Sequence, residues 1–565
     1  MKNLNKTARI AAGIITLGIA LLTFSCDMIP ENKIDLRLTD EMASQSYSQL
    51  LNQGRAVYDY IPKGYNSLDG AMMAAATDEA AHAIPGSNIE KYQSGLWGPA
   101  DNPDNAWKEM YRGIRFANLY LHNSNGYQDI ILRDTSTQAG KAQYLQQCNN
   151  LEWMRNEARV LRAYYYFELI KRYGGVPVVD KIYGPDDVID LPRKSYEQVV
   201  QFILEELDAA LPNLQENWMA QEQASFGRVN KGTAMAIKSR VLLYYASPLN
   251  NPSHAKNRWE LAADAAKNVI DDDNYALANY ATMFTGANGH QNTEVIFCHM
   301  TGNNNTPERY NYPITTNGGA SGTCPSANLV DAYENSDGSV FDWSQVGADG
   351  NPYEGRDPRL NMTVVVNNSQ WNGRAMQCYA GGYDATGIQT TTTGYYLKKF
   401  LTDGLDLELN RTAVHSWPLF RYGEILLNYA EAMNEAYGPD ADPYGDGKTA
   451  RWAVNEVRGR TGVEMPPVTA AGEVEMRERI KHERRIELAF ENHRFWDVRR
   501  WGETDAKAAL NVPIRGVVIQ LAGDIFTYSS KTVENRVFET KMLLYPIPQS
   551  EMLKSGGELE QNKDW

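Results

Sequence analysis

The sequence predicts an all-α protein: a tetratricopeptide-like helix-hairpin scaffold with a large irregular, loop-rich region that carries a few short strands. Two observations predict the scaffold. Apolar residues recur at three- and four-residue spacing in many segments, and these segments come in pairs with short polar connections. A third predicts the irregular region, since residues 276–400 lose this period and are rich in Gly, Asn, Thr and Tyr.

The helices are expected in chain order, each from its apolar stripe and its end signals. The clearest ends at Gly174-Gly175, shortly before Pro177. The sequence from Ser195 to Gln198 forms a capping box, and Asn230 caps a later helix. Helices are therefore predicted over 36–60 (with Thr39 as its N-cap), 105–122, 150–173, 195–211, 230–245, 259–270, 425–436, 450–457 and, as one long charged helix, 473–501. Within the irregular region, 294–297, 362–366 and 395–398 are predicted strands.

Composition limits the function. The chain has 565 residues, of which 43% are hydrophobic and 22% charged, as in ordinary globular proteins. A mean hydropathy of −0.50 excludes a polytopic membrane protein. The net charge of −15 argues against nucleic acid as a partner, since little would neutralise a phosphate backbone.

The N-terminus is expected to be an export signal over residues 1–25. Lys2, Lys6 and Arg9 precede an apolar run from Ile10 to Phe24, which is too short to span a bilayer as a helix. Ser25 followed by Cys26 is similar to a bacterial lipoprotein cleavage box, so we expect lipidation at Cys26 and an outer-membrane location through the lipid anchor. The alternative is plain secretion with Cys26 unmodified. The four other cysteines are expected to be mostly buried thiols, with one bridge at most.

Several segments together resemble the SusD/RagB family of Bacteroidetes surface lipoproteins. The resemblance is carried by Asn156–Pro177 (NEARVLRAYYYFELIKRYGGVP), Trp107–Leu121, Gly227–Ala234, Ile480–Trp501, Leu544–Glu551 and the closing Gln561–Trp565. It implies a non-catalytic glycan-binding lipoprotein, exposed on the outer membrane above a SusC-like TonB-dependent transporter. The implied organisation is a helical region over 26–275, a variable ligand-binding region over 276–400 and a C-terminal helical region over 401–565.

A sugar site needs a flat aromatic ring against the apolar face of the sugar and polar side chains around its hydroxyl rim. Trp97 lies in a Gly- and Pro-punctuated loop, and the family often places an aromatic from this loop in its glycan site. Packing in the core is an equal alternative for Trp97. Asp78, in a segment that resembles the family's, is the second candidate, with a helix cap as an equal alternative. The variable region supplies the others: Tyr310, Tyr312, Trp343, Glu354, Trp371, Arg374 and Tyr395. Taken singly, each of them fits packing within the loops better than contact with a ligand, but several together are expected to line the site.

The sequence offers no cofactor or metal motif. His482-Glu483 lacks the second His of a zinc protease helix, and the run from Asp440 to Gly445 begins like a calcium loop but has Arg451 at its twelfth position. Two other function classes stay open. A surface glycoside hydrolase would need two carboxylates in a cleft, and a helical-repeat scaffold would bind a protein instead of a glycan.

Overall fold

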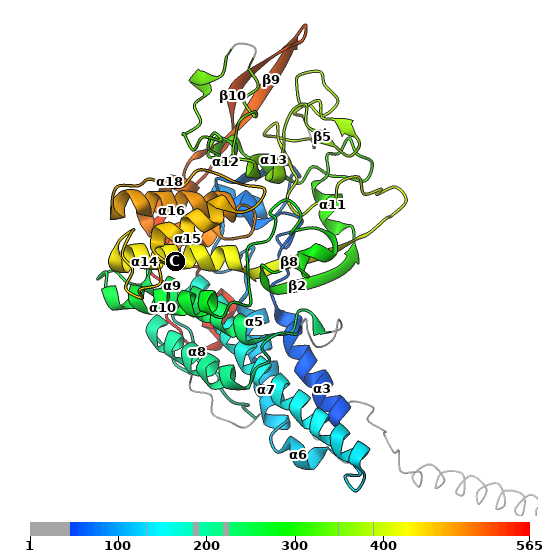
Figure 1. The fold of residues 1–565 in the computed structure, drawn as a ribbon, viewed down its shortest axis with the longest axis vertical. Helices are drawn as coiled ribbons and strands as arrows, with labels where there is room; N and C mark the ends of the chain where they lie inside the picture. The colour runs from blue at the N-terminus through cyan, green and yellow to red at the C-terminus, as the bar shows by residue number, and fades with distance from the viewer. Residues whose placement is uncertain (1–45, 132, 185–190, 219–224, 348–349, 388) are drawn as a thin grey trace, which may run out of the picture.

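The protein is a stack of helices flanked by loops, with a strand hairpin projecting at one end (Figure 1). The computed structural model describes residues 46–131, 133–184, 191–218, 225–347, 350–387 and 389–565. The α-helices are α3 (Tyr47–Ala56), α4 (Ile89–Ser94), α5 (Trp107–Asn123), α6 (Tyr127–Ile130), α7 (Gln138–Tyr173), α8 (Tyr196–Ala210), α9 (Lys231–Ala246), α10 (Lys256–Asp271), α11 (Thr306–Asn311), α12 (Ala327–Val330), α13 (Arg359–Thr363), α14 (Tyr422–Tyr437), α15 (Ala450–Gly459), α16 (Glu473–Glu487), α17 (Arg494–Arg500), α18 (Glu503–Leu510) and α19 (Gln549–Lys554). The predicted class, a helical scaffold with small scattered strands, is confirmed.

Helix α7 is the spine of the N-terminal half. Its 36 residues extend about 54 Å at a rise of about 1.5 Å per residue. Helices α3, α5 and α8 pack on it, and glycines allow two of these crossings. A Cβ on Gly54 would come within 2.3 Å of the Met154 side chain, and one on Gly113 within 2.6 Å of the Tyr165 ring. Small residues therefore set how closely α3 and α5 approach α7.

Helix ends follow the predicted caps. Ser195 and Asn230 each form a capping box, at the starts of α8 and α9. Among the described residues the first α-helix, α3, begins after Ser46, whose side chain accepts from the backbone of Gln49. The predicted cap Thr39 lies outside the described residues. Helix α7 starts earlier than predicted, because Thr137 caps it by accepting from Gly140.

The strands pair in two-stranded antiparallel sheets. The three predicted strands are present, within or close to β2 (Val295–Asn304), β4 (Val364–Val365) and β7 (Tyr396–Leu397). The other strands were not predicted, and the longest of these are β8 (Ala413–Arg421) and the hairpin of β9 (Pro513–Ala522) and β10 (Ile525–Asn535). The alternating apolar residues of β9 pack on α12, but β10 is mostly polar and exposed, which hid it in the sequence. The pairs are β1 (Ala80–His82) with β3 (Thr323–Pro325), β2 (Val295–Asn304) with β8 (Ala413–Arg421), β4 (Val364–Val365) with β7 (Tyr396–Leu397), β5 (Gln370–Trp371) with β6 (Arg374–Ala375), and β9 (Pro513–Ala522) with β10 (Ile525–Asn535).

The predicted long helix over 473–501 was wrong as one element. It breaks into α16 and α17, and Phe490 and Asn492 between them have φ of 64°. This left-handed backbone interrupts a helix, and it allows both Glu487 and Glu491 to face the same cluster of arginines. Acidic and basic residues alternate over 477–500, a pattern that predicts an ion-paired helix instead of an anion site. The structure confirms the ion pairs, since Asp497 pairs with Arg484 at 3.0 Å and with Arg500 at 2.8 Å.

A buried ion cluster joins the loop region to the C-terminal helices. Glu487 accepts from Arg421 at 2.8 Å, from Arg460 at 2.7 Å and from Arg359 at 2.9 Å. All four side chains are fully buried, and Glu294 and Glu491 complete the charge balance. Because Arg359 belongs to α13 and Glu487 to α16, these contacts fasten the irregular region to the scaffold.

The described cysteines are free thiols: Cys298, Cys324 and Cys378 are buried and Cys148 is half-buried. Cys26 lies outside the described residues. Of the helices in the described part of the chain, none has both the length and the apolar character that a bilayer crossing requires. Within the same residues, no three His, Cys, Asp or Glu side chains gather in a way that could hold a metal ion.

Candidate functional site

Trp97 is part of a buried aromatic cluster. Its ring is 7% exposed, and its neighbours are Tyr92, Tyr545 and the C-terminal Trp565, with ring centroids 5.0, 5.2 and 4.8 Å away. Trp565 is fixed in turn, because its indole donates to the Lys541 carbonyl at 2.9 Å. The expectation of an open sugar platform at Trp97 therefore fails in this structure, and the core alternative holds. Two of these three rings, Tyr545 and Trp565, come from the far end of the chain.

Asp78 is also engaged inside the protein. Its carboxylate receives Arg494 at 2.9 Å and Arg485 at 2.8 Å, which tie it to α16 and α17. Burial alone would raise the pKa of Asp78, but these two guanidinium groups outweigh burial and lower that pKa to about 2. The carboxylate thus acts as a link between distant segments, and a sugar hydroxyl would have to displace an arginine to reach it.

Three of the predicted loop aromatics are buried as well. Tyr312 donates to the Thr402 carbonyl and accepts from the Leu405 backbone at 3.2 Å, and its ring lies edge-on to Trp371 with centroids 6.0 Å apart. Tyr395 is fully buried, and its hydroxyl accepts a hydrogen bond from the Tyr353 hydroxyl at 3.3 Å. The prediction that Tyr312, Trp371 and Tyr395 contact a glycan fails for one reason, which is that loop segments distant in sequence cover these rings.

Trp343 is the predicted aromatic that lines a recess. The recess has a volume of about 300 Å³, at the lower end of the range for small-molecule sites. The half-exposed Trp343 indole donates to Asp331 at 2.9 Å, and Asp331 pairs with Arg515 at 2.8 Å. Tyr528 of the β9–β10 hairpin faces Trp343 with a centroid distance of 6.1 Å. A flat ring, a guanidinium and hydroxyls thus meet in one cavity.

A series of contacting aromatic rings runs from this recess into the protein interior. Tyr528 contacts Tyr353, with centroids 5.8 Å apart, and Tyr353 contacts Tyr395, with centroids 6.0 Å apart. The structure therefore links the half-exposed Trp343 to the buried Tyr395 through two intervening rings, without direct contact between them. The sequence analysis missed Tyr528 and Arg515. Val517, Ile519 and Leu521, apolar residues at every second position, would have been the signal for the hairpin that carries them.

Arg374 lies beside an exposed tyrosine that the sequence analysis also missed. Its guanidinium makes two bonds to the buried Asp384 carboxylate, at 2.5 and 2.6 Å, and its carbon lies 5.0 Å from the ring centroid of Tyr383. Tyr383 is 62% exposed. The Gly381-Gly382 pair directly before Tyr383 is a turn signal, and it could have identified this ring as part of an exposed turn.

The two remaining candidates, Tyr310 and Glu354, are accessible, but their contacts are with residues outside the Trp343 recess and the Arg374–Tyr383 pair. Tyr310, on α11, is 37% exposed, and its ring covers Gly70, where a Cβ would come within 2.6 Å. Glu354 is exposed and accepts from Asn351 at 3.1 Å. Four of the nine predicted residues (Tyr310, Trp343, Glu354 and Arg374) are therefore within reach of a ligand.

Comparisons with known proteins agree over most of the chain. A family model described as the SusD family matches residues 287–565, and one described as "Starch-binding associating with outer membrane" matches residues 32–243. SusD-like protein P38 of Formosa agariphila is 23% identical over 89% of this chain and 93% of its own length. SusD-like protein P25 of the same organism is 22% identical over 70% of this chain and 69% of its own length.

Solved structures share the fold. A SusD-like protein of Bacteroides fragilis superposes with a TM-score of 0.75 at 26% identity, covering 93% of this chain and 99% of its own. A structure titled a SusD-like carbohydrate-binding protein, also of B. fragilis, has a TM-score of 0.73 at 24% identity and covers 91% of this chain and 99% of its own. A structure titled a laminarin-binding SusD-like protein has a TM-score of 0.61 at 20% identity, covering 92% and 99%.

Proposed function

This chain belongs to the SusD/RagB family, and on that premise we propose that it is a non-catalytic surface glycan-binding lipoprotein. It captures oligo- or polysaccharide and delivers it to a SusC-like TonB-dependent transporter in the outer membrane. The observation that carries the proposal is the match of both halves of the chain to family models, one of which is described as starch-binding. The titles of two similar structures, carbohydrate-binding and laminarin-binding, support the ligand class.

The Trp343 recess and the Arg374–Tyr383 pair are the proposed contacts with glycan on the loop side. Trp343 and Tyr383 offer ring surface for the apolar face of a sugar, and Arg515 and Arg374 offer donors for its hydroxyls. A hydroxyl that exchanges water for protein gains only ~0.5–1.5 kcal/mol net. A single contact is therefore weak, and a long glycan gains affinity by touching several at once.

The carboxylate of the Trp343 recess supports binding without hydrolysis. A glycosidase needs two carboxyl groups roughly 5–10 Å apart beside the scissile bond. Of the residues that line the Trp343 recess, Asp331 is the one carboxylate, and it is held by Arg515 and by the Trp343 indole. Asp78 and Glu79 are neighbours but both are buried. Neither arrangement offers a free acid and base to a substrate.

The membrane location rests on the leader and on Cys26. A signal peptide over residues 1–25 and an acylated Cys26 would anchor the chain to the outer membrane with its loops facing outward. Metabolic labelling with a palmitate analogue tests this proposal. Label is expected in the full-length protein and absent in Cys26→Ala, which should appear in the soluble fraction. Labelling of Cys26→Ala would contradict it.

Affinity electrophoresis in gels that contain single polysaccharides tests capture. At least one neutral glycan should retard the protein, and the same incubation should release no new reducing ends. Absence of retardation in every gel would overturn glycan binding, and released reducing ends would overturn the non-catalytic role. Delivery is tested separately by detergent extraction from the native host, in which a TonB-dependent barrel should co-purify with the tagged chain.

A further inference from the structure

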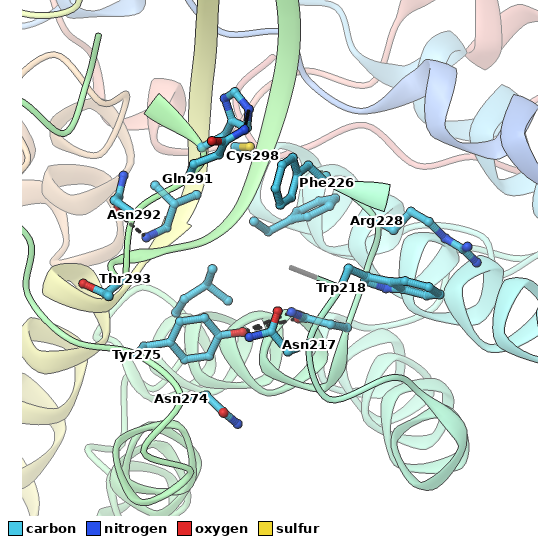
Figure 2. A pocket seen from close by; sticks show the side chains of 16 residues that line it. Asn217, Trp218, Phe226, Arg228, Asn274, Tyr275, Gln291, Asn292, Thr293 and Cys298 are labelled. Atoms are coloured by element: carbon cyan, nitrogen blue, oxygen red, sulfur yellow. Dashed lines mark hydrogen bonds between the residues drawn. The ribbon is translucent and has the colours of Figure 1, made fainter. Parts of the chain in front are cut away.

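A second polar cavity lies away from the Trp343 recess, at the junction of the helical scaffold and the loop region. Its volume is about 290 Å³, and its walls come from the segment before α9, the segment after α10 and strand β2 (Figure 2). We name it the amide pocket, because five side-chain amides line it: Asn217, Asn230, Asn274, Gln291 and Asn292. None of the predicted site residues belongs to it.

Two rings and a threonine hydroxyl accompany the amides. Figure 2 shows Phe226 and Tyr275 on opposite sides of the cavity, with Gln291, Asn292 and Thr293 along one wall. Phe226 and Tyr275 are each half-buried, so each ring has a part that a ligand can reach. Apolar ring surface with amide donors and acceptors around it is what a sugar unit requires.

The polar groups of the amide pocket are held in place by their own contacts. Asn230 donates to the Tyr275 hydroxyl at 3.2 Å. Gln291 bonds through Nε2 to His290 at 3.2 Å, and the other His290 nitrogen bonds to Ser416 at 3.0 Å. These bonds restrict the rotation of the Gln291 amide, which lines the cavity. Such fixed side chains lose little conformational entropy on binding.

The pocket carries no uncompensated charge. Arg228, its one permanently charged residue, is paired with the buried Glu157 at 2.5 Å and stacks on Trp218 at 3.8 Å from the ring centroid. Burial lowers the pKa of His290 and raises the pKa of Cys298 to about 12, so both are neutral at pH 7. A carboxylate or sulfate would enter without a cation to pair with, which is costly. The chemistry therefore selects neutral, hydroxyl-rich ligands.

We propose that the amide pocket is a second carbohydrate subsite, which takes one neutral sugar unit by amide hydrogen bonds and ring contacts. The inference rests on the proposed function, because it assigns a further contact for the same glycan class. It also sets specificity: uronic acid chains are excluded from the amide pocket, whereas the arginines of the loop side do not exclude them.

Isothermal titration of the full mature chain tests the proposal. The probes are laminarihexaose, maltohexaose, xylohexaose and mannohexaose, with hexagalacturonic acid as the acidic probe. The wild type is compared with Asn274→Ala/Gln291→Ala, which removes two amides at the pocket's edge. A matched control, Gln201→Ala/Asn213→Ala, removes the same two groups from exposed positions outside the pocket. Phe226→Leu is a second variant that keeps the apolar volume but removes the ring.

The expected result is that at least one neutral hexasaccharide binds the wild type and the control equally. Its affinity should fall about five- to a hundredfold in Asn274→Ala/Gln291→Ala, from two lost hydrogen bonds, and also fall in Phe226→Leu. Unchanged affinity in both pocket variants would overturn the inference, and so would binding of hexagalacturonic acid alone, while the proposed function would stand in both cases. Failure of every probe and polysaccharide to bind the wild type would overturn both.

Discussion

The ion cluster around Glu487 and the amide pocket around Gln291 use polar side chains in opposite ways. Around Glu487, charged groups are fully buried and each is matched by opposite charge. Around Gln291, the amides are neutral and range from the buried Asn230 to the exposed Asn274. A buried charge must keep its partner, whereas a neutral amide at a cavity edge can exchange water for a ligand at small cost. The first region fixes the fold, and the second is suited to a ligand.

Removing Glu487 should have the largest effect on stability. In Glu487→Ala, Arg359, Arg421 and Arg460 lose a shared partner and remain buried, which should cost about 3–5 kcal/mol in free energy of unfolding. Urea unfolding followed by circular dichroism measures the loss. The control is Glu473→Ala on the same helix, whose pair with Arg477 is exposed and should contribute less than about 0.5 kcal/mol. Equal losses in the two variants would contradict the account.

Trp97→Ala should come next. The ring lies among Tyr92, Tyr545 and Trp565, so its removal leaves a cavity and should cost about 3 kcal/mol. Glycan affinity, measured at a temperature where the variant is folded, should not change. Had Trp97 been a sugar platform, the variant would lose affinity and keep its melting temperature. That opposite result would return Trp97 to the ligand site.

Glu79 gives the ion-paired region a pH dependence of its own. Burial, assisted by the charge of Asp78, raises the pKa of Glu79 to about 8, against ~4.3 in an unfolded chain. The folded state therefore holds this proton, and stability falls as pH rises from ~4.3 towards 8. Glu79→Gln removes that loss. Its stability relative to wild type should rise by more than about 1 kcal/mol between pH 4.5 and pH 7.

The pH dependence of stability that Asp78 contributes has the opposite sign to that of Glu79, so Asp78 serves as the internal control. Its pKa is lowered to about 2, so its contribution is present above an unfolded value of ~3.9 and is lost as pH falls towards 2. Asp78→Asn should therefore be less stable than wild type at neutral pH, and this difference in stability should disappear only in acid. If the relative stability of Glu79→Gln did not change with pH, the burial of Glu79 would be refuted.

Trp343→Ala should have the smallest effect on stability and a clear effect on binding. The indole is half-exposed at the recess, so its loss should cost less than about 1 kcal/mol of stability. Loss of its ring contact should weaken glycan affinity about tenfold. Trp452→Ala, half-buried on the scaffold helix α15, is the matched control and should keep wild-type affinity. A reversal of the two affinities would move the ligand site to the scaffold.

The frame was largely predictable, because its signals are local. The capping boxes at Ser195 and Asn230, and the stop at Gly174, depend on residues within one turn of each other. The charge alternation over 473–501 predicted ion pairs, but not the break at Phe490 and Asn492, which depends on arginines that come from elsewhere in the chain.

The ligand side was less predictable, because exposure of a loop aromatic is set by segments far along the chain. Trp97 is covered by Trp565, Tyr312 by Thr402, and Tyr395 by Tyr353. The sequence predicted a loop around Trp97 and an irregular, loop-rich region that contains Tyr312 and Tyr395, but it did not show which rings the folded chain would cover. The amide pocket escaped notice for the same reason, since Asn230, Asn274 and Gln291 meet only after folding.

Titration of the mature chain with neutral polysaccharides, followed by a reducing-end assay on the same sample, tests the central claim most directly. The account predicts saturable binding of at least one glycan, with the number of reducing ends unchanged after prolonged incubation. Saturable binding that is followed by new reducing ends would contradict it, and so would a complete absence of binding by a correctly folded chain.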